Sequence, residues 1–354
     1  MKKRRGKVFF IALGCSILFI IFFPRAYTPE TYFTDSWEIP ISSGYSDIPE
    51  DKRDMVVPFQ SKSHFGYVTA GGEMVTTEGI FYNVSFSENY YINYAAVTEN
   101  LLIKNVSGEI IETIPTTGYP LFIQNRLFIV DKDRCGISEW DIDGNRLWER
   151  RFPSLITAFG CDEECVAVGF LNGEILLLDG KRREIFRDIP TGSRIRIIYG
   201  LAVAPGEEYF AVIMGIDPQR LVIYRKGEAG FRPYHSEKLK GDFRRETFIQ
   251  FTDEHTLFYE QPRSLVQYDI PRKESRSFPT AGTPRKIIID EKKRLIMFHH
   301  TGAGQAKFDI YTASGMPLSH FQLPKNTYVH FLKGSLFFTV GDRVRKIDIR
   351  GGEN

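Results

Sequence analysis

A group of four short apolar runs, separated by turns, recurs along most of this chain and restricts the folds that it can adopt. In the clearest copy, residues 154–190, the runs are LITAFGC, CVAVGF, EILLLD and REIFRDIP, and Asn172-Gly173 and Gly180 lie in turn positions. The preceding copy, residues 117–153, has the same order, with Asp143-Gly144 in a turn. Short runs rich in aromatic and β-branched residues, bounded by Gly, Asn and Asp, predict β-strands. Because one small sheet cannot bury both of its faces, each copy must pack between neighbouring copies.

The spacing of the copies predicts their number. Five copies close on an apolar residue followed by proline, and successive closing prolines are 38, 37, 89 and 45 residues apart, the interval of 89 holding two copies. Four-stranded repeats of this length predict a β-propeller. Complete units are expected at 79–116, 117–153, 154–190, 195–239, 243–279 and 284–324, and three further strands within 328–350.

The seventh unit needs a fourth strand from elsewhere in the chain. The run from His64 to Glu78 precedes the first complete unit, and its pairing with the C-terminal run, residues 344–349, would close the ring and remove the exposed sheet edges. We therefore expect an all-β, seven-bladed propeller over residues 64–352. Eight blades are the alternative, if residues 54–78 form a unit of their own. Residues 26–63 contain four prolines among polar residues and predict a stalk or linker.

The beginning of the chain predicts one transmembrane helix. Residues 1–7 carry five cations and form a cytoplasmic tail, and the sixteen residues 8–23 that follow are uncharged. A helix of that length rises about 24 Å, and flanking cations can reach the headgroups, so residues 8–25 are assigned as a signal-anchor helix. The excess of cations before the helix places the rest of the chain outside the cytoplasm, in the periplasm if the source has two membranes.

Two other interpretations of residues 8–25 stay open. A cleaved signal peptide shares the charged start and the apolar run, although Pro24-Arg25-Ala26 lacks the small residues of a cleavage site. The sequence Ala12-Leu13-Gly14-Cys15 is similar to a degraded lipoprotein box, but eight apolar residues follow Cys15 and would be left exposed after lipid attachment.

The charge balance argues against nucleic-acid binding. The net charge is +2, and six cations with no acid precede residue 26, so the remainder of the chain carries −4. A domain that binds the phosphate backbone is normally basic on at least one face. We therefore expect the lipid bilayer and an envelope protein as partners, and no nucleic acid.

Two segments carry a resemblance to known families. Residues 140–148, Trp-Asp-Ile-Asp-Gly-Asn-Arg-Leu-Trp, and residues 172–180, Asn-Gly-Glu-Ile-Leu-Leu-Leu-Asp-Gly, resemble repeats of WD40-like and quinoprotein-like (PQQ-type) propellers. That superfamily includes quinone-dependent dehydrogenases and non-enzymatic outer-membrane assembly factors, so the resemblance implies the fold more than the function. A dehydrogenase of this kind needs a stacking tryptophan and a calcium site on the axis. Because Trp140 and Trp148 lie on outer-strand hairpins, no cofactor is expected.

Few residues predict local chemistry. Cys161 and Cys165 flank a predicted turn in an exported domain, which makes a disulfide possible, and two separate buried thiols are the alternative. Adjacent strand residues point to opposite sides of a sheet, so His299 and His300 cannot share a metal, and one buried and one exposed histidine are expected. The spacing of Asp141 and Asp143 predicts a hairpin turn and no calcium loop. No catalytic, cofactor-binding or metal-ligating residue is assigned.

These features favour a membrane-anchored, extracytoplasmic propeller that acts as a protein-binding or scaffolding module. The alternative is an envelope hydrolase or lyase with a pocket on the propeller axis, since catalytic residues gathered by a ring of blades need not form a local motif. An acidic cluster converging on the axis would favour the enzyme. An exposed apolar patch rimmed by polar residues would favour the partner-binding module.

Overall fold

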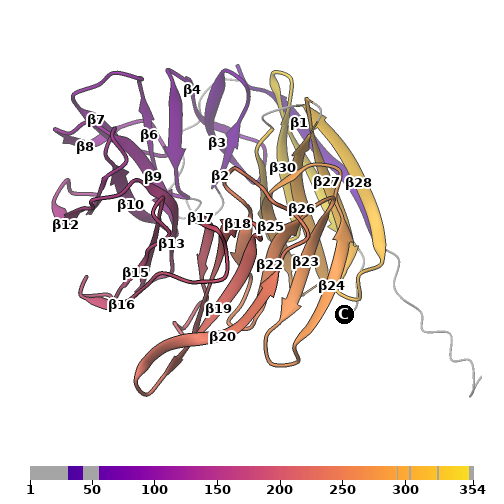
Figure 1. The fold of residues 1–354 in the computed structure, drawn as a ribbon. Coiled ribbons are helices and arrows are strands. Elements are labelled where there is room, and N and C mark those ends of the chain that lie inside the picture. Colours follow the sequence, from indigo (N-terminus) through magenta and orange to yellow (C-terminus); the bar gives the residue numbers. More distant parts are fainter. Residues whose placement is uncertain (1–30, 43–55, 293, 303, 325–326, 351–354) are drawn as a thin grey trace, which may run out of the picture.

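The computed structural model describes residues 31–42, 56–292, 294–302, 304–324 and 327–350, and these residues form eight antiparallel β-sheets arranged around a common axis (Figure 1). Seven sheets have four strands and one has three. The predicted all-β propeller is therefore confirmed. Among the described residues no helix is long and apolar enough to cross a bilayer, and the predicted anchor, residues 8–25, lies outside them.

The first four blades follow the chain from residue 56 to residue 188. Blade 1 holds β2 (Val56–Gln60), β3 (His64–Thr69) and β4 (Met74–Gly79). Blade 2 holds β5 (Asn83–Phe86), β6 (Tyr90–Tyr94), β7 (Leu101–Asn105) and β8 (Ile110–Ile114). Blade 3 holds β9 (Tyr119–Ile123), β10 (Arg126–Val130), β11 (Gly136–Trp140) and β12 (Arg146–Arg151). Blade 4 holds β13 (Ile156–Cys161), β14 (Val166–Phe170), β15 (Ile175–Leu178) and β16 (Glu184–Asp188).

The other four blades complete the ring. Blade 5 holds β17 (Ile195–Val203), β18 (Tyr209–Ile216), β19 (Arg220–Gly227) and β20 (Gly230–Lys238). Blade 6 holds β21 (Ile249–Phe251), β22 (Thr256–Gln261), β23 (Ser264–Asp269) and β24 (Glu274–Pro279). Blade 7 holds β25 (Thr283–Asp290), β26 (Leu295–Gly302), β27 (Gln305–Thr312) and β28 (Pro317–Pro324). Blade 8 holds β29 (Val329–Leu332), β30 (Ser335–Val340), β31 (Arg343–Arg350) and, as its outer strand, β1 (Tyr32–Pro40).

The prediction of seven blades is wrong, and the eight-bladed alternative describes the ring. The run that begins at His64 does not pair with the C-terminal strand, because it forms β3 and β4 of a separate blade. The closing strand is β1, which pairs antiparallel with β31 so that Tyr32 lies opposite Arg350 and Pro40 opposite Arg343. Figure 1 shows β1 beside the C-terminal strands. The segment 26–63, predicted as a stalk, therefore supplies both β1 and β2 to the propeller.

The hydrophobic core consists of clusters between blades. Each of eight clusters joins side chains from two neighbouring blades, and together they account for all eight junctions of the ring. At the junction of blades 4 and 5, the rings of Phe210 and Tyr224 stack with centroids 4.6 Å apart. At the closing junction, Val57 and Phe59 of blade 1 pack with Phe337 of blade 8. Burial of one such aromatic side chain contributes about 2–3 kcal/mol, so the ring is held by many similar contacts.

The order of the strands defines the two faces of the propeller. In the four-stranded blades the first strand lies nearest the axis, and alternate turns therefore lie at opposite ends of the sheet. One face, which we call the connection face, carries the links between blades and the turns between second and third strands. The other, which we call the turn face, carries the remaining two turns of each blade.

Candidate functional site

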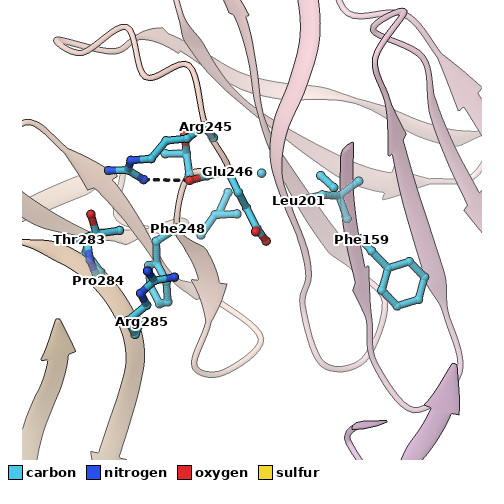
Figure 2. Close-up of a pocket in the computed structure, with 12 residues that line it drawn as sticks. Phe159, Leu201, Arg245, Glu246, Phe248, Thr283, Pro284 and Arg285 are labelled. Carbon is cyan, nitrogen blue, oxygen red and sulfur yellow. Dashed lines mark hydrogen bonds between the residues drawn. The ribbon is translucent and has the colours of Figure 1, made fainter. Parts of the chain in front are cut away.

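A pocket of about 430 Å³ lies on the axis of the ring, where residues from the inner strands of blades 4–7 converge. Arg245, Glu246 and Phe248 come from the start of blade 6, and Arg285 comes from the start of blade 7. Figure 2 shows these side chains around the opening, together with the hydrogen bond that Arg245 donates to the carbonyl oxygen of Glu246, 2.8 Å away. The alternative enzyme hypothesis places its pocket at such a position, and a pocket alone does not test that activity.

The charges of the axial pocket are only partly paired. The guanidinium of Arg245 makes a two-pronged ion pair with Glu260, with distances of 2.6 and 3.0 Å, and Glu260 is buried. Glu246 makes no ion pair with a described residue, and Arg285 donates only to the hydroxyl of Thr301, at 3.1 Å. The lining therefore offers one unpaired carboxylate and one unpaired guanidinium. The acidic cluster that would favour a glycan hydrolase is not found among the lining residues.

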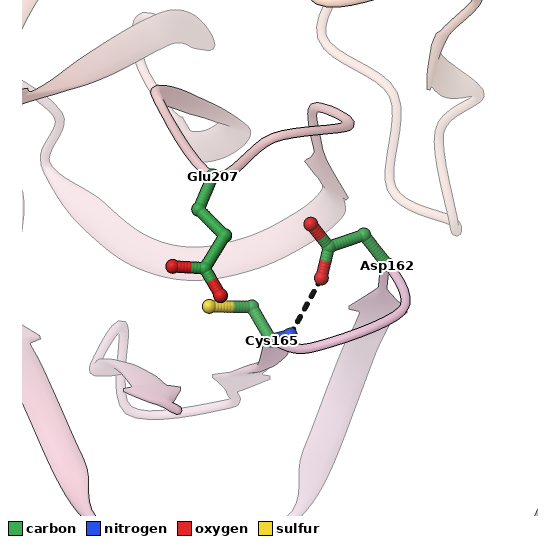
Figure 3. Close-up of side chains that lie close together, drawn as sticks. All are labelled: Asp162, Cys165 and Glu207. Atoms are coloured by element: carbon green, nitrogen blue, oxygen red, sulfur yellow. Dashed lines mark hydrogen bonds between the residues drawn. The ribbon is translucent and has the colours of Figure 1, made fainter. Parts of the chain in front are cut away.

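A second group of reactive side chains lies on the turn face, between blades 4 and 5. One ligand atom each from Asp162, Cys165 and Glu207 lies within 4.8 Å of the others (Figure 3). Asp162 accepts hydrogen bonds from the backbone N–H groups of Glu164, at 3.0 Å, and Cys165, at 2.5 Å, so its position is fixed by the turn. Glu207 reaches this turn from the next blade and pairs with Lys226, at 3.0 Å.

These three residues could hold a divalent cation, but their protonation opposes it. Burial raises the pKa of the Cys165 thiol far above its ordinary value, and the Glu207 carboxylate raises it further. Burial alone would also raise the pKa of Glu207, but hydrogen bonds from Lys226 and Cys165 bring it below its ordinary value. The Cys165 thiol, the Glu207 carboxylate and the Lys226 ammonium therefore satisfy one another at neutral pH. A protonated thiol is a poor metal ligand and a poor nucleophile.

The disulfide predicted between Cys161 and Cys165 is not present in the structure, where both are free thiols. Cys161 lies opposite Val166 in the ladder of β13 and β14, and it packs in the cluster between blades 3 and 4. Cys165 packs in the cluster between blades 4 and 5. The two side chains therefore point to opposite faces of one sheet, and Cβ atoms that point apart cannot be bridged without a shift of the backbone. The alternative of two separate buried thiols agrees with this arrangement.

The other residues singled out from the sequence lie as follows. Asp141 accepts hydrogen bonds from the backbone N–H and the side-chain amide of Asn145, at 2.7 and 3.0 Å, so this segment is the turn between β11 and β12, as predicted. His299 and His300 do point to opposite sides of β26, but both are buried, with 9% and 1% of their surfaces exposed. The expectation of one exposed histidine is therefore wrong. Burial of His300 is compensated by Asp309 on the neighbouring strand, whose carboxylate lies 2.5 Å from the Nε2 of His300.

Two groups of exposed apolar side chains lie on the connection face. Phe81, Tyr82 and Val97 of blade 2 are 74%, 57% and 83% exposed. We call these three residues the blade 2 patch. A second group, which we call the blade 4–5 patch, consists of Leu155, Leu171, Ile189 and Ile195, each more than 40% exposed.

Contacts between loops make the blade 4–5 patch continuous. The N–H of Leu171 donates to the carbonyl oxygen of Leu155, at 2.9 Å. Gly173 has a positive φ of 88° and lies so close to the next blade that a Cβ atom there would be 1.9 Å from the carbonyl oxygen of Arg196. Only glycine fits this position, and it keeps the turn of blade 4 against the link to blade 5. The second patch is thus formed by loops that are packed together.

Comparison with known proteins agrees with this architecture. The chain belongs to a family of β-propeller proteins, whose model matches residues 1–353. An uncharacterized protein of Treponema pallidum (strain Nichols) is 24% identical over 295 residues, which cover 80% of this chain and 78% of that protein. Among solved structures, BamB from Moraxella catarrhalis is similar, with a TM-score of 0.61, 11% identity, and coverage of 90% of this chain and 100% of that chain. A chain of the mitotic checkpoint complex is also similar, with a TM-score of 0.55, 11% identity, and coverage of 89% and 98%. Identities this low show the fold alone.

Proposed function

We propose that this protein is a membrane-anchored, extracytoplasmic propeller that binds another envelope protein through its connection face. The observation that carries the proposal is the exposure of Phe81, Tyr82 and Val97. Large apolar side chains that are exposed together on one face mark an interaction site. Aromatic side chains are enriched at the centres of protein interfaces, where they supply area at a low cost in side-chain entropy.

The rigidity of the ring supports recognition. Eight hydrophobic junctions fix the blades, so the loops of the connection face are held before a partner arrives. A surface that is already ordered loses less entropy on binding. The similar chain from the mitotic checkpoint complex is a precedent for a propeller of this shape within a protein assembly. An enzyme that acts from the axial pocket stays the alternative, and Glu246 is the carboxylate that it would use.

Site-specific photocrosslinking tests the proposed surface. A photoreactive amino acid placed at Phe81 or Leu171 in the full chain, in its own envelope, should give one reproducible adduct of higher mass. Leu147 and Met316 are matched controls, because they are exposed to similar extents, 55% and 50%, at turn-face ends of their blades. We expect adducts at the connection-face positions to exceed the controls several-fold. Equal labelling at both faces, or none at either, would reject the surface.

The orientation in the membrane has its own test. A reporter that is active only outside the cytoplasm should be active when it is fused after Asn354, because the excess of cations in residues 1–7 holds the N-terminus inside. Reversal of the charge, with acidic residues in place of Lys2, Lys3, Arg4 and Arg5, should lower the reporter's activity at least several-fold. An unaltered fusion that is stably produced but inactive would contradict the proposed orientation.

A further inference from the structure

Side chains from blades 2, 7 and 8 meet on the inner side of the ring. The rings of Phe86, from blade 2, and Tyr328, at the start of blade 8, have centroids 5.0 Å apart. The ammonium of Lys286, from blade 7, lies 5.2 Å from the centroid of the Tyr328 ring, and the His330 ring stacks at 6.4 Å from that ring. Blades 2 and 8 flank blade 1, which has three strands in the described residues, so Phe86 and Tyr328 meet beside that blade.

A β-bulge places two cations next to each other at this point. In the ladder of β25 and β26, Pro284 lies opposite His300 and Lys286 opposite His299, so Arg285 is an extra residue. Bulges of this kind redirect side chains. Arg285 consequently lines the pocket, and Lys286 stands directly across from His299 on the same face of the sheet. Cβ atoms of such directly opposed residues lie about 4.5–5.5 Å apart.

Several polar atoms of this group have no partner. Within the part of the chain that the structure describes, Lys286 makes neither a hydrogen bond nor an ion pair, and its recorded contact is the Tyr328 ring. The buried Nε2 of His299 and the buried Nδ1 of His330 also lack a hydrogen-bond partner. His299 is only 9% exposed. A buried polar atom without a partner costs about 1–3 kcal/mol, so two such atoms beside an ammonium without an ion pair call for an explanation.

The surroundings are electropositive. Arg285 adds a guanidinium that no carboxylate of the described residues pairs. Two carboxylates are in the vicinity: Glu88, which is exposed on a turn of blade 2, and Glu246, which belongs to the blade 6 wall. Neither forms an ion pair with Lys286 or Arg285. Burial, with smaller effects of His300, Lys286 and Arg285, lowers the pKa of His299 to about 4, and burial together with Lys286 does the same for His330.

We propose that the centre of the ring binds an oxyanion, a phosphate or carboxylate group of a small molecule, between Lys286, His299 and His330, with Arg285 at its entrance. An ammonium and two imidazole N–H groups would donate to the oxygens, which satisfies the three unpaired positions together. The rings of Phe86 and Tyr328 form an apolar wall, and Arg285 also lines the pocket of about 430 Å³, toward which the rest of the ligand would extend. This site uses axial residues, so it is independent of the partner surface on the connection face.

Thermal unfolding of the full-length chain in detergent tests the site. Sodium phosphate and sodium citrate are titrated separately against sodium chloride of equal ionic strength. A ligand that binds only the folded state raises the melting temperature as its concentration rises. We expect a concentration-dependent increase beyond that of chloride with phosphate, with citrate or with both, and the arm that responds identifies the chemistry of the group.

Variants assign the response to these residues. Lys286→Met should weaken the apparent affinity at least tenfold, because it removes the only ammonium in the group. Lys132→Met is the matched control: it removes an exposed lysine from a turn of blade 3 and should keep the wild-type response. His330→Gln gives a second variant if Lys286→Met does not fold, and it should also weaken binding. Equal effects of phosphate, citrate and chloride, or unchanged binding in both variants, would overturn the proposal.

Discussion

A chain from which residues 32–41 are removed is expected to lose most of its folding free energy. Strand β1 is the fourth strand of blade 8, so its removal would expose β31 as an edge and open the closing junction. The indole of Trp37 packs on the Phe337 ring with centroids 5.9 Å apart, and its N–H donates to the carbonyl oxygen of Ala70 in blade 1, at 3.1 Å. The strand therefore holds both blade 8 and blade 1.

The expected loss is large in relation to the stability of a typical domain. Truncation of a packed tryptophan to alanine costs about 3 kcal/mol or more, and the ion pair between Asp35 and Arg345, 2.6 Å long and partly exposed, adds little. The other apolar contacts of the strand bring the total to about 5 kcal/mol, which is close to the whole free energy of unfolding of many domains. Thermal unfolding followed by circular dichroism should show a much lower midpoint or no cooperative transition.

A peptide of residues 31–42 provides the control for this deletion. Added in excess, it should restore the transition, because an extended peptide can pair with an exposed edge strand through its backbone. The same peptide with Trp37→Ala and Ile39→Ala should not, since it keeps the backbone but loses the side chains that pack at the junction. A shortened chain that unfolds at the wild-type temperature would show that β1 does not close the ring.

The sequence was sufficient to locate the regular blades. Each of the six units expected between residues 79 and 324 holds the four strands of one blade, with Thr283 of β25 one residue outside its expected unit. The reason is local: glycine, asparagine and aspartate occupy the turns, and an apolar residue followed by proline closes five of the units. Where every turn carries its own signal, the number of strands can be read without knowledge of their partners.

The closing blades were missed because their signals are weak. Pro58 lies inside β2, and a register shift between Asp35 and Trp37 interrupts the alternation of β1. Prolines near a strand normally argue against it, so this segment has the composition of a linker. Blade 1 also has three strands in the described residues, so it does not match the repeat.

The candidate sites could not be found from spacing, because they join residues that are distant in the chain. Glu207 approaches Cys165 from the turn of the next blade, and Phe86 meets Tyr328 although their blades are separated by blade 1. For the two cysteines, only the ladder register decides which face each side chain takes. A shift of one residue in that register would move each cysteine side chain to the other face of the sheet. Exposure of Phe81 likewise follows from the position of its loop and has no signature in the sequence.

Acidification from pH 6.5 to about 4 is expected to destabilise the propeller through two axial histidines. Burial, with neighbouring cations, lowers the pKa of both His299 and His330 to about 4, whereas an imidazole in the unfolded chain titrates near 6.5. Between these values the unfolded state binds protons that the folded state does not, so stability falls as the pH falls. The shift of His299 corresponds to about 3 kcal/mol once the pH reaches the folded-state value.

Several charged or titratable groups face the imidazoles of His299 and His330 between pH 6.5 and 4. Lys286 and Arg285 are cations throughout this range, and His300, which lies on the other side of the strand with Asp309, also lowers the pKa of His299. The exposed carboxylate of Glu88 acts on Lys286 and Tyr328. Carboxylates that are held below their ordinary pKa, such as Glu139 with Arg126, lose their contribution only at lower pH. The loss above pH 4.5 is therefore assigned to the imidazoles.

Urea unfolding at several pH values between 7 and 4.5, in a buffer of constant ionic strength, measures this loss. The variant His299→Gln keeps a polar side chain of similar length but cannot take up a proton, so its free energy of unfolding should fall less steeply with acidification, by about 2–3 kcal/mol over the window. His320→Gln is the matched control, because His320 is exposed on the outer strand of blade 7 and folding does not remove it from water. If His299→Gln and the wild type lost stability in parallel, the buried imidazole would not be the source of the acid sensitivity. The same measurement separates the anion-site proposal from the effect of histidine burial. Addition of phosphate should reduce the loss of wild-type stability at low pH only if protonated imidazoles bind the anion. The loss of stability in chloride alone depends on burial of the histidines.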